Sequence, residues 1–447
     1  MTAIARARGA AGNRNAASAA PAPTLSQTAV PLWERALAVY CIFHYSDGLW
    51  GTLFASPNAV DESPMLRLLW YPVYILGLLG LMRIWREASK QLLGATMLIG
   101  LLVYTFMSMG WSVEPDVTFR RSIALIMTTL FGVYLATRYD WRSLVLLFAA
   151  SFATMAVVGF IGSLVAPKLF VHQLEYAGAW MGVWRHKNQM GSLMARGVVA
   201  CVCAAVLMPR RRNMWLGFAV FCFVMVLLAQ SITSVLATVL GLTVVGIFWT
   251  ASKGALSGYT FAYCLLMIGL AALSAVLFAP DALFQLAGRD STLTGRAGIW
   301  MLVEQEIAKA PMFGHGYQAF WHGLHGSAAH IRQALWFNVP HSHNSWLELM
   351  LDLGYFGAVG VGGYFALMTA RTLTKFKEPM IGAFALATLA ATFLFSLSET
   401  VLWLPNYYLH VMLIAIGIKL STEANARRTA AIFKPTRTYR NRAAQHY

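Results

Sequence analysis

The sequence predicts an all-α polytopic membrane protein. Of its 447 residues, 58% are hydrophobic and only 12% are charged, whereas an ordinary soluble domain has about 25% charged residues. So few charges cannot cover the surfaces of the soluble domains that this length would otherwise suggest. Apolar runs long enough to cross a bilayer recur along the chain. These observations exclude a soluble globular enzyme and a disordered or fibrous protein.

The chain begins with an Ala-rich segment, residues 1–31, which we expect to be a disordered cytoplasmic tail. A cleavable signal would place its apolar core before an Ala-x-Ala site, and here the order is reversed. Nine candidate transmembrane helices follow in residues 32–279 and three in residues 345–420, before a basic cytoplasmic tail, residues 421–447. Among these predictions, the hydropathy signal is weakest for the first span and for the division between two spans at Gln230-Ser231. The twelve expected spans are 33–55, 65–84, 92–110, 119–137, 142–165, 189–208, 213–229, 232–250, 258–279, 345–370, 380–397 and 400–419.

Basic residues give the expected orientation. The formal net charge of +16 comes from 34 Lys and Arg against 18 Asp and Glu. In a soluble protein this excess would suggest nucleic acid, but here a basic residue or cluster follows every even-numbered span, as the positive-inside rule requires of cytoplasmic loops. We therefore expect cytoplasmic termini and no nucleic acid partner. The exceptions, on or near the outer side, are Arg67, Arg120, Arg121, Lys168, Arg185, Lys187, Arg196, Arg289, Arg296, Lys309 and Arg332.

The longest connection, residues 280–344, is expected to be a large periplasmic loop, and loops of this length are usually functional. Its stretch 298–309 predicts an amphipathic helix at the outer interface, ended by Pro311 and followed by a turn at Gly314 and Gly316. The apolar face of this helix comprises Ile299, Trp300, Val303 and Ile307. A structural cap over the bundle is the simpler interpretation, and it is compatible with a functional one.

Polar residues gather at the outer ends of three expected spans. They are Arg185, His186, Lys187 and Asn188 before the sixth span, Arg289 and Arg296 after the ninth, and His341, His343 and Asn344 before the tenth. Interfacial anchoring is the alternative for the first group. Arg binds phosphate bidentately, and His can accept a proton from a hydroxyl. Such a cluster at a membrane face therefore suits a phosphorylated lipid substrate, in contact with the bilayer.

Two other interpretations compete with this one. A metal site would need carboxylates or a His-Glu-x-x-His pattern, and the nearby carboxylates best suited to such a site are Asp290 and Glu348. We expect Glu348 to orient His343 as a hydrogen-bonding partner, and we expect no metal and no cofactor. A membrane transporter would place ionisable groups at mid-membrane. The gathering of polar groups at one face favours an enzyme instead.

Four segments carry a resemblance to the bacterial O-antigen ligase and O-antigen and exopolysaccharide polymerase superfamily. Residues 182–191 are similar to its HKN-x-x-G segment, and residues 291–300 to its S-L-T-G-R-x-x-I-W segment. Residues 311–317 resemble its P-x-x-G-x-G turn, and residues 341–348 its H-N-x-x-L-E segment. The resemblance covers about residues 180–355, and the large loop before the last spans also matches.

The resemblance implies a GT-C-type, metal-independent, inverting glycosyltransferase of the bacterial inner membrane, with its site facing the periplasm. Its donor would be a saccharide on undecaprenyl diphosphate. Arg296 would bind the diphosphate and His343 would be the general base, held by Asn344 and Glu348. Either Arg185 or Lys187 would fill a second phosphate-binding role, and Arg120 and Arg121 have no assigned role.

The acceptor divides this superfamily. Our first choice from the sequence is a ligase that acts on lipid A-core in lipopolysaccharide biosynthesis. The alternative is a polymerase that extends a lipid-linked glycan, as in exopolysaccharide synthesis, and a third branch glycosylates proteins. The shared motifs do not separate these functions.

Overall fold

The computed structural model describes residues 29–54, 63–174, 176–254, 256–257, 260, 296–335 and 339–432. Over these ranges the chain is a bundle of helices with one isolated antiparallel bridge, between Val171 and Trp180. The first half comprises α1 (Leu32–Tyr45), α2 (Trp50–Phe54), α3 (Pro64–Arg83), α4 (Trp85–Leu93), α5 (Thr96–Met107), η2 (Ser108–Trp111), α6 (Pro115–Arg138), α7 (Trp141–Val165) and α8 (Pro167–Phe170). The second half comprises α9 (Lys187–Leu207), η3 (Pro209–Arg211), α10 (Arg212–Leu228), α11 (Ile232–Ala251), α14 (Arg296–Lys309), α15 (Ala329–Leu335), α16 (Ser345–Thr372), η4 (Leu373–Lys375), α17 (Pro379–Ser396) and α18 (Tyr408–Ile432).

Eight helices of the described ranges are long and apolar enough to cross a membrane, or nine if the bent pair α4 and α5 counts as one span. The protein is therefore a multi-pass membrane protein, as its composition predicts. The twelve expected spans exceed this number. One of them, residues 258–279, lies outside the described residues except for residue 260.

Two of the expected spans are interrupted in the structure. The first expected span, 33–55, is broken, because α1 ends at Tyr45 and Asp47 and Leu49 adopt positive φ before α2 begins. The 14 residues of α1 extend about 21 Å at 1.5 Å per residue, which is short of a bilayer core of about 30 Å. The third, 92–110, contains a break, since α4 and α5 meet at 87°. By contrast, the predicted division at Gln230 is confirmed, with α10 ending at Leu228 and α11 beginning at Ile232.

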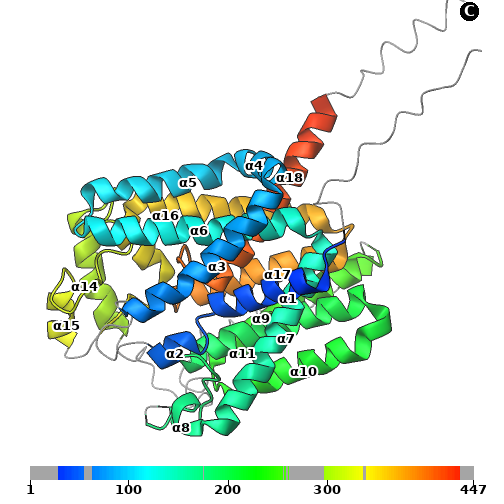
Figure 1. Cartoon of the computed structure of the whole chain (residues 1–447), viewed down its shortest axis with the longest axis horizontal. Coiled ribbons are helices and arrows are strands. Elements are labelled where there is room, and N and C mark those ends of the chain that lie inside the picture. Colours follow the sequence, from blue (N-terminus) through cyan, green and yellow to red (C-terminus); the bar gives the residue numbers. More distant parts are fainter. Residues whose placement is uncertain are drawn as a thin grey trace, which may run out of the picture.

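The last expected span, 400–419, is wrong in its first part. Residues 397–407 form a loop, and α18 begins only at Tyr408 and runs to Ile432. The expected tail, 421–447, is therefore helical up to residue 432, and α18 projects beyond the other helices at the upper right of Figure 1. Hydropathy could not find this boundary, because the loop contains the apolar residues Val401, Leu402 and Trp403, all of which are buried.

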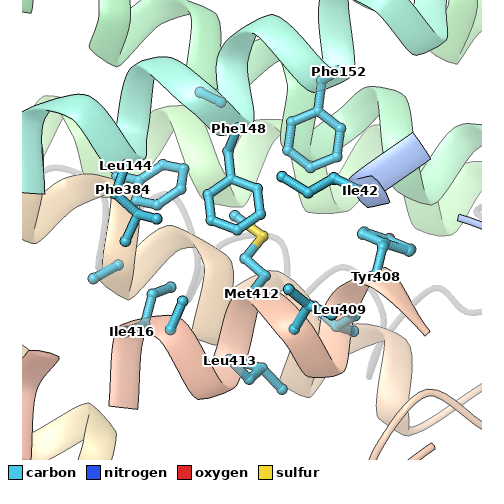
Figure 2. Close-up of a cluster of buried hydrophobic side chains, with 14 of the residues drawn as sticks. Ile42, Leu144, Phe148, Phe152, Phe384, Tyr408, Leu409, Met412, Leu413 and Ile416 are labelled. Atoms are coloured by element: carbon cyan, nitrogen blue, oxygen red, sulfur yellow. The ribbon is translucent and has the colours of Figure 1, made fainter. Parts of the chain in front are cut away.

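The core forms where α7, α17 and α18 meet. Figure 2 shows Phe148 of α7 next to Met412 of α18, with Phe384 of α17 beside them. The rings of Phe148 and Phe384 lie 6.0 Å apart between centroids, and Phe152 meets Tyr408 edge to face at 6.2 Å. The largely buried helix α9 packs against α7, α10, α11 and α17. These contacts fix the start of α9 relative to the loop between α17 and α18.

Helix α16 has two parts, because Gly354 has φ of 68° and ψ of −171° inside it. The turn at residues 311–316 packs tightly against this kink. His315 N–H donates to Leu351 C=O at 2.8 Å, and Gly316 N–H donates to Asp352 C=O at 3.0 Å. Gly314 and Gly316 adopt positive φ, so the expected turn at these glycines is present. The kink holds the first part of α16 against the segment 310–317.

The segment before α16 supplies a small second core. Ile299, Val303 and Ile307 of α14 are buried against residues that include Phe320, Ile331 and Leu351, and Trp300 is partly buried there. The expected apolar face of the helix is thus present, and it packs on protein. In Figure 1, α14 and α15 lie at the left of the bundle, and α2 and α8 lie at the lower left. In this view these elements lie toward the left and lower left of the bundle (Figure 1).

Candidate functional site

Three of the predicted polar segments meet at a residue that belongs to none of the four motifs. Glu399 lies in the loop 397–407, outside the membrane-spanning helices. Its Oε1 accepts hydrogen bonds from Asn188 Nδ2 at 2.7 Å and from the Arg296 guanidinium at 3.4 Å. Its Oε2 lies 3.3 Å from His343 Nδ1. The starts of α9, α14 and α16 thus converge on one carboxylate.

The environment of Glu399 favours its ionised form. Burial alone would raise the pKa of this carboxyl group. The hydrogen bond with His343, together with the charges of His343, His341 and Arg296, outweighs burial and lowers the pKa of Glu399 to about 2. The site therefore carries a fixed negative charge surrounded by cationic and polar groups.

The backbone of His343 adopts the uncommon left-handed conformation. Its φ is 53°, a region that residues other than glycine rarely adopt and that is found at functional sites. His343 N–H donates to His341 Nδ1 at 3.1 Å, and the two imidazole rings lie 4.1 Å apart between centroids. His341 Nδ1 is also 3.3 Å from the hydroxyl oxygen of Thr400. The predicted pair of histidines is therefore brought together, beside the same loop as Glu399.

Asn344 and Glu348 support this segment differently from the prediction. Asn344 Oδ1 accepts from the backbone N–H groups of Trp346 at 2.9 Å and Leu347 at 3.3 Å, so Asn344 is the N-cap of α16. Glu348 Oε2 accepts from Ser342 N–H at 2.9 Å. The carboxylate hydrogen-bonded to His343 is Glu399, so the expectation that Glu348 orients the imidazole directly is wrong. Glu348 lies one helical turn past the N-cap, which places it beside the backbone of Ser342 instead.

Arg296, the first described residue of α14, reaches the same loop. Its Nη1 donates to Ser398 C=O at 2.8 Å, while Nη2 faces Glu399. The side chain is 27% exposed. Trp300, one turn further along, donates from Nε1 to Ser342 C=O at 3.0 Å. Arg296 and His343 are therefore both fixed relative to the loop 397–407, and they share Glu399.

The polar residues at the start of α9 have two sets of partners, and His186 and Asn188 lie near Glu399. His186 is the N-cap, and its Nδ1 accepts from Asn188 N–H at 3.2 Å. Burial lowers the pKa of His186, opposed by the charge of Glu399, which favours the neutral ring that this hydrogen bond requires. Asn188 then reaches Glu399. His186 and Asn188 are thus part of the convergence.

The cations Arg185 and Lys187 are already engaged elsewhere. Arg185 donates to Asp47 Oδ2 at 2.7 Å. Lys187 is only 5% exposed. Its Nζ donates to Gln230 C=O at 3.2 Å and lies 4.0 Å from the ring centroid of Tyr176. Both side chains are therefore held by protein groups.

The remaining basic residues that break the positive-inside rule include four arginines, and none of the described ones contacts Glu399 in the hydrogen bonds given above. Arg289 lies outside the described residues. Arg120 is exposed on α6, and Arg121 is close enough to Tyr317 to oppose the raised pKa that burial gives this phenol. Arg196 is buried within α9, where it donates to the backbone oxygen of Ser192 at 3.0 Å. Within the described ranges, no group of three or more His, Cys, Asp or Glu residues is arranged to hold a metal ion.

A sequence signal for Glu399 does exist. It is the only acidic residue between Glu378 and Glu423, in a region that otherwise consists of apolar runs. The positive-inside rule gives little weight to acidic residues, so span assignment passes over it. An isolated acid between two apolar runs of a membrane protein is a functional hypothesis by default.

Comparison with known proteins supports the resemblance predicted from the motifs. Residues 217–362 match the family described as O-antigen ligase. The chain is also 26% identical over 271 residues to the exopolysaccharide production protein ExoQ of Rhizobium meliloti. That match covers 58% of this chain and 60% of the relative. The family match contains Arg296, His343 and Glu348 and ends before Glu399.

Proposed function

We propose that this chain, a relative of the bacterial O-antigen ligases and polymerases, transfers a saccharide from undecaprenyl diphosphate to an acceptor hydroxyl during polysaccharide biosynthesis. The observation that carries the proposal is the convergence of Arg296 and His343 at the loop 397–407. The site places a permanent cation beside an imidazole, which are the two groups that this transfer needs. We assign it to the periplasmic face of the inner membrane, with cytoplasmic termini, from the basic loops on the opposite side.

His343 would be the general base. Its Nδ1 faces Glu399, which favours the tautomer with the proton on Nδ1 and leaves Nε2 to accept the proton of the acceptor hydroxyl. The hydroxyl oxygen attacks the anomeric carbon as the bond to the diphosphate oxygen breaks. A single displacement of this kind inverts the configuration at that carbon.

Arg296 would stabilise the leaving diphosphate. Negative charge grows on the diphosphate as the glycosidic bond breaks, so a guanidinium held nearby stabilises the transition state more than the ground state. A diphosphate leaves without protonation. The reaction would therefore need no general acid of the kind that the paired carboxylates of glycosidases provide, and Arg296 would supply the positive charge that a metal ion otherwise provides.

We favour glycan polymerisation as the reaction. The relative ExoQ is described as an exopolysaccharide production protein, and its similarity extends over more of this chain than the family match does. This choice reverses the order of preference from the motifs alone. Ligation is the second candidate, because residues 217–362 match the family described as O-antigen ligase.

Reconstitution with two acceptors tests the proposal. The purified protein would be placed in liposomes with an undecaprenyl-diphosphate oligosaccharide and either a second lipid-linked glycan or lipid A-core. Lengthened lipid-linked glycan is the expected product, and a lipid A-linked product would assign the chain as a ligase. Failure to consume any lipid-linked donor, together with solute uptake into the liposomes, would overturn the enzyme assignment in favour of a transporter.

A further inference from the structure

The carboxylate of Glu399 is shared by groups from three distant parts of the chain. Asn188 and Arg296 contact Oε1 at 2.7 and 3.4 Å, and His343 contacts Oε2 at 3.3 Å. The side chain of Glu399 is 19% exposed, so the charge is mostly shielded from solvent. The two oxygens have different partners, since Oε1 faces the amide and the guanidinium while Oε2 faces the imidazole.

Hydrogen bonds of the loop 397–407 fix the position of Glu399. The hydroxyl of Ser345, at the start of α16, donates to Glu399 C=O at 2.8 Å and accepts from Val401 N–H at 2.8 Å. Trp403, which has φ of 56°, donates from Nε1 to Thr105 Oγ1 at 2.9 Å. The loop is thereby tied both to α16 and to α5. Such contacts hold the carboxylate in place before any substrate binds.

We propose that Glu399 is the positioning residue of the transfer reaction, which fixes the imidazole of His343 and the guanidinium of Arg296 relative to each other. This inference rests on the proposed function. The carboxylate accepts a hydrogen bond from Nδ1 of His343 and so favours the tautomer that carries its proton on Nδ1. The unprotonated Nε2 is then free to face the acceptor hydroxyl. When His343 takes up the proton, the charge of Glu399 stabilises the imidazolium.

The same carboxylate sets the strength of the base. An anion beside an imidazole favours its protonated form, so we expect the loss of the charge of Glu399 to change the pH dependence of the transfer reaction. Groups on several elements act on His343 and its partner. They are His341 on the same segment, Glu348 on α16, Arg296 on α14, and His186 and Asn188 at the start of α9. Each variant in the test changes only one of the groups in this site.

The test is the pH dependence of kcat in two variants with opposite expected effects. Glu399→Gln keeps an oxygen acceptor but removes the charge, so the acidic limb of the profile should move to lower pH and kcat should fall about 10-fold. Asn188→Ala removes a donor from Oε1 and leaves more negative charge for His343. Its acidic limb should therefore move to higher pH. A residue with only a structural role would lower kcat equally at all pH values.

Glu378→Gln is the matched control. Glu378 pairs with Lys375 at 2.8 Å just before α17, at the other end of that helix from Glu399, and its loss should leave both kcat and the acidic limb at their wild-type values. Acidic limbs at the wild-type pH in both site variants would overturn the inference while the proposed function stands. If Glu399→Gln does not fold, the direction of the shift in Asn188→Ala decides. Absence of transfer by the wild-type protein would instead overturn the proposed function.

Discussion

At the scale of single residues, the site depends on groups that the sequence places far apart. Arg296 and His343 can be proposed from their motifs, because Arg suits phosphate and His suits proton transfer. Glu399 cannot be assigned in this way, since no spacing links it to them. Its role follows only from the distances of 3.4 and 3.3 Å that join it to the two residues.

The first prediction concerns the shape of the cation at position 296. Arg296 spans two acceptors, with Nη1 on Ser398 C=O and Nη2 facing Glu399. Arg296→Lys keeps the charge but loses this planar fork, so we expect kcat/KM for the lipid-linked donor to fall about 100-fold. Initial rates of donor consumption would measure this. Arg35→Lys, at an exposed position in α1, should retain wild-type rates, and full activity of Arg296→Lys would exclude a bidentate role.

The second prediction concerns stability in acid. The pKa of Glu399 is about 2 in the folded protein, below the value expected in the unfolded chain. The contribution of Glu399 to the free energy of unfolding is therefore present above about pH 4.5 and is lost as the pH falls toward 2. This contribution is at most about 3 kcal/mol. Thermal unfolding in detergent between pH 6 and pH 3 would detect this loss. Glu399→Gln should show a smaller decrease in Tm than the wild type over that range. Equal decreases would contradict the claim that the folded protein lowers the pKa of Glu399.

At the scale of elements, the tight contact between the turn at 311–316 and the kink of α16 explains why this segment is rich in glycine. A Cβ at Gly354 would clash with the backbone of Met312, and one at Gly314 would clash with the backbone of Asp352. Both residues also have positive φ. The turn signal at Gly314 and Gly316 is readable from the sequence, whereas the kink is not, because an isolated glycine is compatible with a continuous span.

The third prediction tests this contact. Gly354→Ala should destabilise the protein by about 2–3 kcal/mol, because the new methyl group meets backbone atoms that cannot move aside. It should also lower activity, since the start of α16 carries His343. The control is Gly100→Ala in α5, where a Cβ meets open space and the change should be neutral or slightly stabilising. Equal Tm values for the two variants would show that the kink is not required.

At the scale of the whole molecule, composition and charge predict the class of protein, and hydropathy locates most of the long helices. Hydropathy fails where apolar residues are buried by the protein itself, as in the loop 397–407, because an apolar residue that contacts protein and one that contacts lipid look alike in the sequence. The break near Asp47 has a different cause, because Ser46, Asp47 and Gly48 form a turn signal that hydropathy averages into the apolar residues on either side. The acidic residue that joins the site lies within such a loop, so the fold has to be known before its role can be proposed.

The central claim is that His343 is the base of a metal-independent glycosyl transfer. The most direct measurement is donor consumption and product formation in liposomes with an undecaprenyl-diphosphate oligosaccharide and excess EDTA, comparing the wild type with His343→Ala. We predict that the wild type transfers the glycan with inversion at the anomeric carbon, whereas His343→Ala binds the donor but does not transfer it. Wild-type turnover by His343→Ala, or a strict metal requirement of the wild type, would contradict the claim.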